Sequence, residues 1–246
     1  MFFDKVKSKD SRATLNHLKC VQYWHRPAGG LNEVVLKMVE KGVKHPVFLG
    51  KDYVELFVGS CLGMALEQAL LENFWIAKPE NDPPDMLFMT MVQYRNRGIK
   101  FHSREVEVVR HINANISLYE TVMKKDKAYP EDYALVCLIE TPGIVDFKKT
   151  AESLKKDLKH ISHVFLLFHG VMVEELDKYV SRIGAILNSY AYTVVQLAPK
   201  FNQQTVDVMK CLEKGKLESK KLVYVEGVNV YYGLRKGDVK YPNIIN

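Results

Sequence analysis

The stretch that decides the fold is a strand led in by two prolines, together with the strand that returns from it. Residues 82–92 read DPPDMLFMTMV and residues 104–110 read REVEVVR, with the turn residues RNRG at 95–98 between them. Proline cannot continue a helix, so the chain reaches Asp85 in an extended form. Acidic residues at 85, 105 and 107 then stand inside otherwise apolar elements. A buried carboxylate needs a partner, and a divalent cation is a common one.

Two helices are predicted before this stretch. Residues 31–41 place apolar side chains on one face, and Gly42 follows as a stop. Residues 52–77 form a longer apolar segment that carries Glu67 and includes a candidate break near Gly59. Small residues at 59, 60 and 63 leave room for a neighbouring backbone to approach this helix closely, at some cost in helix propensity.

After the returning strand, apolar segments alternate in type along the chain. Helices are predicted at 113–125, 146–159, 174–189 and 206–213, strands at 86–92, 101–111, 133–140, 164–168 and 191–197, and a hairpin at 222–234. The alternation from 133 to 197 predicts parallel strands joined by crossovers. We therefore expect an α/β fold, a mixed central β-sheet flanked by helices. Its parts are a lead-in with one helix (1–50), an α/β core (51–200), and a helix and hairpin (201–246) appended to the same domain.

Composition narrows the class of protein. Of the 246 residues, 47% are hydrophobic, which is enough for a substantial core, and the formal net charge of +6 permits nucleic-acid binding without requiring it. The cysteines form no C-x-x-C pair, and Cys61 and Cys137 lie in apolar segments, so we expect buried free thiols and a cytoplasmic protein. The first residues lack the apolar core of a signal peptide, and no apolar run reaches membrane-spanning length.

The length of the turn between the two central strands determines which acids share a face. An odd-numbered loop centred on Asn96 places Asp85 opposite Glu107, and then Asp85, Glu105 and Glu107 lie on one face with opposed β-carbons about 5 Å apart. An even-numbered loop places Asp85 on the other face, because a slip of one residue inverts the set. The sequence leaves both loops open.

These residues resemble the PD-(D/E)XK nuclease superfamily over residues 52–168. The resemblance consists of Glu67 in an apolar helix, Pro-Pro-Asp at 83–85 opening a strand, acids at 105–107 on the next strand, and the helix and buried strands that follow. Its third element has two interpretations. One takes Glu107 as the acid and places Val109 where the family usually has lysine. The other takes Glu105 as the acid and places Glu107 at the lysine position, as in some restriction endonucleases.

The resemblance implies a restriction-endonuclease-like core and a metal-dependent DNA endonuclease, which in the restriction type usually acts as a homodimer on symmetric sites. One or two Mg²⁺ ions (or Mn²⁺) would bind Asp85, Glu105 and Glu107, and Glu67 would assist as the helix glutamate. Such an ion lowers the pKa of a bound water and offsets charge on the scissile phosphate. Basic residues near the turn are candidates for phosphate contacts: Arg95, Arg97, Lys100, Arg104 and Arg110.

Each of these residues also has an ordinary structural interpretation. Glu67 would be an exposed helix residue, Asp85 the cap of a turn, and Glu105 and Glu107 the solvent side of an alternating strand. The five basic residues would be solvated turn and edge residues. Two other functions stay open. One is a catalytically inactive relative that binds DNA or a protein. The other is an unrelated α/β protein that binds a small molecule or nucleotide near residues 141–143 and 169–170, at the carboxyl ends of two buried strands.

Overall fold

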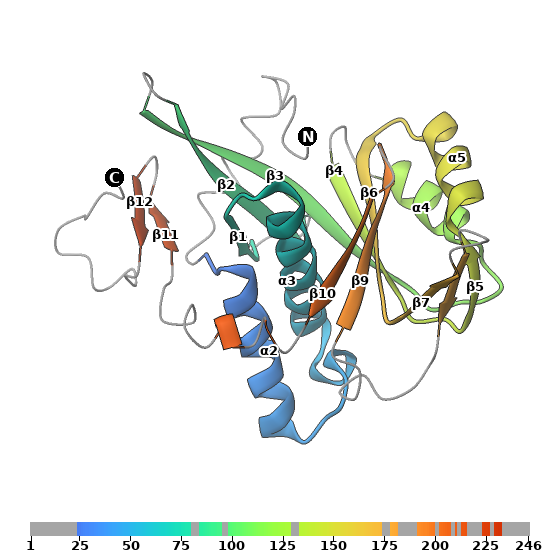
Figure 1. Ribbon diagram of the computed structural model, residues 1–246, viewed down its shortest axis with the longest axis horizontal. Coiled ribbons are helices and arrows are strands. Elements are labelled where there is room, and N and C mark those ends of the chain that lie inside the picture. The colour runs from blue at the N-terminus through green and yellow to red at the C-terminus, as the bar shows by residue number, and fades with distance from the viewer. Residues whose placement is uncertain are drawn as a thin grey trace. The chain divides into compact units, whose positions relative to one another are not determined.

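The fold is α/β, as the sequence predicts, with one mixed sheet of seven strands and flanking helices (Figure 1). The computed structural model describes residues 24–79, 84–94, 98–128, 133–173, 178–181, 191–199, 202–207, 210, 213–215, 223–226 and 229–232. The chain divides into two compact units, one formed by Met1–Glu105 and Met209–Asn246 and the other by Val106–Val208. The domain boundaries that the sequence suggests, at 50/51 and 200/201, stay a prediction.

Among its described residues, the first unit is built from α-helices and antiparallel strands. Its elements are α2 (Pro27–Lys41), the 3-10 helix η1 (Pro46–Leu49), α3 (Lys51–Leu70), β1 (Phe74–Ala77), β2 (Met86–Tyr94), the beginning of β3 (Gly98–His111), and the strands β11 (Val223–Glu226) and β12 (Asn229–Tyr232). Strand β1 pairs antiparallel with β2. The pairing of β11 with β12 confirms the predicted hairpin near the carboxyl terminus.

Helix α2 follows the signals in its sequence. Pro27 occupies its first turn, where an amide hydrogen would have no partner within the helix. Gly42 ends it in the left-handed conformation, with φ of 65°, and donates its amide hydrogen back to the last turn. The predicted stop at Gly42 is therefore confirmed.

Helix α3 is one uninterrupted helix from Lys51 to Leu70, without a break at Gly59. The predicted helix ran on to residue 77, and this extension is wrong because Phe74–Ala77 form β1. Phenylalanine, tryptophan and isoleucine favour strands as much as helices when buried, so an apolar pattern alone cannot mark this change. Leu71, with φ of 55°, turns the chain out of the helix.

Small residues allow α2, α3 and β2 to approach one another closely. A β-carbon at Gly63 would lie 2.6 Å from Cγ of Pro27, and one at Gly59 would lie 2.7 Å from Cε of Met86. A real β-carbon does not come that close to a neighbouring atom, so the Pro27 ring requires glycine at 63, whereas the flexible end of Met86 could move away from a β-carbon at 59. The predicted close approach at 59–63 is confirmed, and it brings the amino-terminal half of α3 against the start of β2.

The second unit contains the parallel part of the sheet. Its elements are the end of β3, α4 (Leu118–Asp126), β4 (Tyr133–Ile139), β5 (Gly143–Asp146), α5 (Phe147–Asp157), β6 (Ile161–Phe168), β7 (Gly170–Val173), β8 (Lys178–Ser181), β9 (Ala191–Ala198) and β10 (Asn202–Asp207). Strands β3, β4 and β6 are parallel, whereas β9 and β10 are antiparallel to their neighbours. The complete sheet has the order β1-β2-β3-β4-β6-β9-β10, and β5-β8-β7 form a smaller sheet.

Three predictions fail in the second half of the chain. The helix predicted at 174–189 is wrong where the structure describes it, because residues 178–181 form β8. The helix predicted from residue 206 is wrong at 206–207, which belong to β10. Parallel pairing of the strand at 191–197 is also wrong, since β9 runs antiparallel to β6. After β6 the chain enters β7 and β8 of the smaller sheet before it reaches β9.

The core of the second unit is apolar and aromatic. Helices α4 and α5 pack with β4, β6 and β9, and Phe147, Phe168 and Tyr179 form an aromatic cluster inside this core.

Cys137 in β4, like Cys61 in α3, is a buried free thiol, as the sequence predicts. Within the described residues, no helix is long and apolar enough to cross a membrane.

Candidate functional site

The acidic residues that the sequence singles out are buried. Only 5% of Asp85, 9% of Glu105 and 2% of Glu107 is exposed to solvent. The interpretation of Glu105 and Glu107 as the solvent side of their strand is therefore wrong. Ionised carboxylates in such positions need hydrogen bonds or cations around them. The surroundings of each acid then decide whether it serves the fold or a chemical site.

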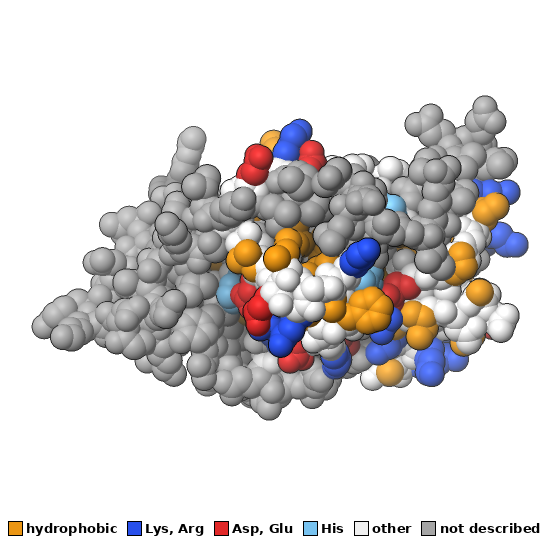
Figure 2. Space-filling model, turned by 90° about the horizontal axis from the view of Figure 1, so that it is seen from below, with side chains coloured by type: hydrophobic (Ala, Val, Ile, Leu, Met, Phe, Trp, Pro, Cys, Tyr) orange, Lys and Arg blue, Asp and Glu red, His pale blue; other side chains and the backbone are white. Residues whose placement is uncertain are grey.

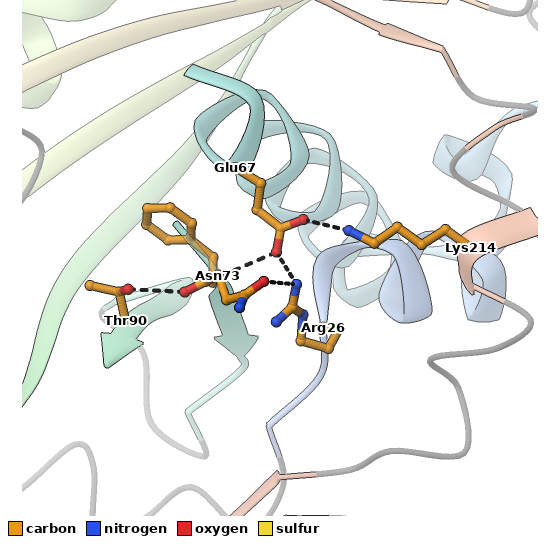
Figure 3. A network of polar contacts seen from close by, with 6 residues as sticks. Arg26, Glu67, Asn73, Thr90 and Lys214 are labelled. Atoms are coloured by element: carbon orange, nitrogen blue, oxygen red, sulfur yellow. Dashed lines mark hydrogen bonds and ion pairs between the residues drawn. The ribbon is translucent and has the colours of Figure 1, made fainter. Parts of the chain in front are cut away.

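Glu67 holds three segments of the first unit together (Figure 3). Its Oε1 accepts hydrogen bonds from Nη2 of Arg26 at 2.6 Å and from the amide of Phe74 at 3.1 Å. Its Oε2 accepts one from Nζ of Lys214 at 3.0 Å. Arg26 also donates to Oδ1 of Asn73 at 2.8 Å and lies over the Trp75 ring, 5.1 Å from its centroid. Both carboxylate oxygens of Glu67 thus accept hydrogen bonds. They connect the end of α3 to Arg26, the residue before α2, and to Phe74, the first residue of β1.

The glutamate of α3 that lies beside Asp85 is Glu55. One ammonium group bridges the two acids, because Nζ of Lys51 lies 3.2 Å from Oε1 of Glu55 and 3.2 Å from Oδ1 of Asp85. Lys78, directly after β1, donates to Oε2 of Glu55 at 2.8 Å and also pairs with Asp52. We call Lys51, Asp52, Glu55, Lys78 and Asp85 the Glu55 cluster. It brings together the first two turns of α3, the end of β1 and the residue that opens β2.

Burial and charge perturb the carboxyl group of Glu55. Its pKa is raised above the ordinary value, chiefly by burial and further by the charge of Asp85 and a hydrogen bond with it, while Lys78 acts in the opposite direction. Lys78 in turn has a raised pKa because Asp52 and Glu55 outweigh the effect of its own burial. Three acids and two lysines give the cluster a deficit of one positive charge when all are ionised. The site therefore favours an added cation or a proton.

Glu105 and Glu107 occupy neighbouring positions on β3 but belong to different compact units. Within the second unit, Glu107 lies beside Leu135 in the parallel pairing of β3 with β4. In the described part of the chain, no group of three histidine, cysteine or acidic side chains is arranged to hold a metal ion. The carboxylates that the structure visibly brings together are those of Glu55 and Asp85, and the metal-binding roles of Glu105 and Glu107 stay predictions.

The basic residues near the turn have different surroundings. Arg95 and Arg97 lie outside the described residues, and Lys100 lies on β3 with its side chain outside the description. Arg104 is buried, with 3% exposed. Arg110 donates through Nη2 to Oε1 of Glu140 at 3.2 Å. On the face shown in Figure 2, acidic and basic side chains are interspersed among hydrophobic ones.

Sequence reasoning missed Glu55, and a signal for it exists. Lys51 and Glu55 are separated by four residues, the spacing at which side chains meet on a helix. Valine, leucine and phenylalanine flank Glu55 in the sequence. Such neighbours indicate an acid on a buried helix face, and they do so for Glu55 as clearly as for Glu67. Comparisons with protein-family models, curated proteins and solved structures give no match to this chain. The functional argument therefore depends on the geometry of the Glu55 cluster.

Proposed function

We propose that the protein is a metal-dependent DNA endonuclease whose divalent cation binds between Glu55 and Asp85. The observation that carries the proposal is the position of Lys51 Nζ, 3.2 Å from an oxygen of each carboxylate. A cationic group already stands where a metal ion would bind, and it reaches this position from solvent, since 62% of the Lys51 side chain is exposed. A hydrated cation could take its place without rearrangement of the core.

The residues of the cluster fit Mg²⁺ or Mn²⁺. Both ions prefer carboxylate oxygens, and Mg²⁺ keeps several of its waters and needs only one or two protein carboxylates. Glu55 and Asp85 supply two, and waters would complete the coordination of the ion. The raised pKa of Glu55 fits the same role, because a cation between the two acids relieves the repulsion that opposes ionisation.

Each residue of the cluster has a role in this proposal. Glu55 and Asp85 hold the ion, and Lys78 fixes the Glu55 carboxylate through its 2.8 Å hydrogen bond. Lys51 leaves the pair when the ion binds, and its long side chain then contacts a phosphate of the substrate. Bound there, the ion supplies an activated water and offsets charge on the phosphate. Lys51 and Lys78 also provide the basic side chains that the Glu105–Val109 stretch lacks.

The proposed substrate is double-stranded DNA, cut by a homodimer. The net charge of +6 favours association with a polyanion. Two copies of one site would act on the two antiparallel strands of a symmetric sequence. Sedimentation of the protein with and without a DNA duplex measures the stoichiometry.

Nicking of supercoiled plasmid in Mg²⁺ or Mn²⁺ tests the proposal. Glu55→Gln and Asp85→Asn should each abolish nicking, because they remove charge with little change of shape. Glu40→Gln is the matched control, since Glu40 is an exposed glutamate of α2 in the same unit and pairs with Lys37. Nicking that survives both cluster substitutions would place the active site elsewhere.

Calorimetry with Mn²⁺ or Ca²⁺ separates the enzyme from an inactive relative. The proposal expects binding by the wild type and by Glu40→Gln, and none by Glu55→Gln. Absence of binding and of nicking in the wild type would favour the non-catalytic DNA- or protein-binding module over the enzyme.

A further inference from the structure

A cavity of about 500 Å³ opens in the second unit, at the carboxyl ends of β3 and β4. His111, the last residue of β3, and Thr141 and Gly143, which follow β4, form one side. The first turns of α4 and α5 form the other. The carboxyl edge of parallel strands is where α/β proteins commonly bind ligands, and this volume lies in the range of small-molecule sites. All the lining residues belong to the second unit, so the cavity is independent of the Glu55 cluster.

His111 contacts Thr121 through one of its ring nitrogens. Only 6% of His111 is exposed, and burial lowers its pKa, so the ring is neutral at pH 7. Its Nδ1 lies 3.0 Å from the hydroxyl oxygen of Thr121, and that hydroxyl lies 3.3 Å from the carbonyl oxygen of Ser117. In the tautomer that satisfies both contacts, Nδ1–H donates to the hydroxyl, which donates to the carbonyl, and Nε2 is an acceptor.

Helices α4 and α5 begin at this cavity, and a carboxylate already caps each of them. Glu120 accepts the amide hydrogen of Ser117 at 2.8 Å at the start of α4, and Asp146 is the amino-terminal cap of α5. Lys149, in the first turn of α5, is the exposed cation of the lining. The carboxylate of Asp146 is the acidic group in the lining, and it accepts the amide hydrogen of Lys149 at 2.9 Å. Thr150 and Ser153 supply hydroxyl groups on the same helix.

Apolar side chains complete the lining and are left open to solvent. Ile116 is 42% exposed and Ile144 is 66% exposed, and Pro142 lies in the same lining. Solvent-exposed isoleucines beside a polar cavity indicate a surface that a flat apolar group can cover. The cavity thus combines a histidine, a lysine with neighbouring hydroxyl groups, and an apolar rim.

We propose that this cavity binds a nucleoside monophosphate. The phosphate lies against Lys149 and the hydroxyl groups of Thr150 and Ser153, which line the same side of α5. A ribose hydroxyl donates to Nε2 of His111, and the base lies on the apolar rim. The ligand needs all three features, because a simple anion would leave the acceptor on His111 and the exposed isoleucines without a counterpart.

Isothermal titration calorimetry of the full chain with AMP, GMP, CMP and UMP tests this inference, in EDTA so that no metal site contributes. Lys149→Gln removes the charge, and Lys155→Gln is the matched control in the last turn of the same helix. His111→Asn keeps a donor toward Thr121 but removes the Nε2 acceptor. Inorganic phosphate and ribose 5-phosphate are titrated alongside.

At least one of the four nucleotides should bind, about tenfold more weakly to Lys149→Gln and to His111→Asn and unchanged to Lys155→Gln. If none of them binds, or if both cavity variants bind like the wild type, the inference is overturned. Inorganic phosphate binding as tightly as the nucleotides would also overturn it, because it would reveal an anion site without recognition of the nucleoside. If His111→Asn fails to fold, the exposed Lys149→Gln still decides.

Discussion

Glu55, in the second turn of α3, is held against Asp85 at the start of β2 by a single ammonium group that lies 3.2 Å from an oxygen of each. Burial is the main cause of the raised pKa of Glu55, and the charge of Asp85 beside it raises that pKa further. Natural proteins keep such an arrangement at a cost in stability, and buried groups with perturbed pKa values are enriched at functional sites. We therefore expect that a substitution that neutralises one acid of this pair increases the stability of the protein and decreases its activity.

The pH dependence of stability should report the Glu55 carboxyl. Because its pKa in the folded state is raised above the ordinary value of 4.5, its contribution to stability is complete below that value and is lost as pH rises through the folded pKa. Glu55→Gln stays neutral at every pH. We therefore expect the stability of Glu55→Gln relative to wild type to increase from pH 4 to pH 7, measured by urea unfolding. A constant difference across this range would mean that Glu55 is not perturbed.

Lys51→Ala should tighten divalent-cation binding while leaving the protein folded. The exposed ammonium competes with the ion for the same two oxygens, so its removal should lower the Kd for Mn²⁺ by about two- to fivefold, the magnitude of a partly exposed ion pair. Calorimetry measures this directly. Lys44→Ala, an exposed lysine outside the cluster, is the control. Weaker binding by Lys51→Ala would show that the lysine supports the ion and does not compete with it.

Glu67 should prove important for stability rather than for chemistry. Glu67→Ala leaves the guanidinium of Arg26, whose side chain is 8% exposed, without its carboxylate partner, and breaking a buried ion pair costs about 3 kcal/mol. Urea unfolding should show this loss. Glu40→Ala, which breaks an exposed pair, is the control and should unfold at nearly the same urea concentration as the wild type.

Plasmid nicking by the folded fraction of Glu67→Gln provides the complementary measurement. The glutamine keeps the shape of the side chain, and nicking per folded molecule should match the wild type. Loss of nicking by a folded Glu67→Gln would instead support the catalytic role of Glu67 that the family resemblance implies.

The sequence predicts Glu67 as the helix glutamate of the site, whereas the structure places Glu55 beside Asp85. Both are single acids in an apolar helix, and twelve residues separate them by about 18 Å along the axis and a third of a turn around it. Which one faces Asp85 depends on how α3 packs against β2, where Gly59 lies against Met86. Local signals sufficed for the ends of α2, the strand opened by Asp85 and the carboxyl-terminal hairpin. The direction of β9 depended on the path of β7 and β8, which no local pattern specified.

The thiol of Cys137 should be inert in the folded protein. Burial in β4 raises its pKa to about 12, so the thiolate that reacts with disulfide or alkylating reagents is scarcely populated at pH 8. Brief alkylation with iodoacetamide, followed by mass spectrometry of the peptides, should leave Cys137 unmodified in native protein and modify it fully in 6 M guanidinium chloride. Rapid native labelling of Cys137 would mean that the parallel strands β3, β4 and β6 open readily on the timescale of the labelling.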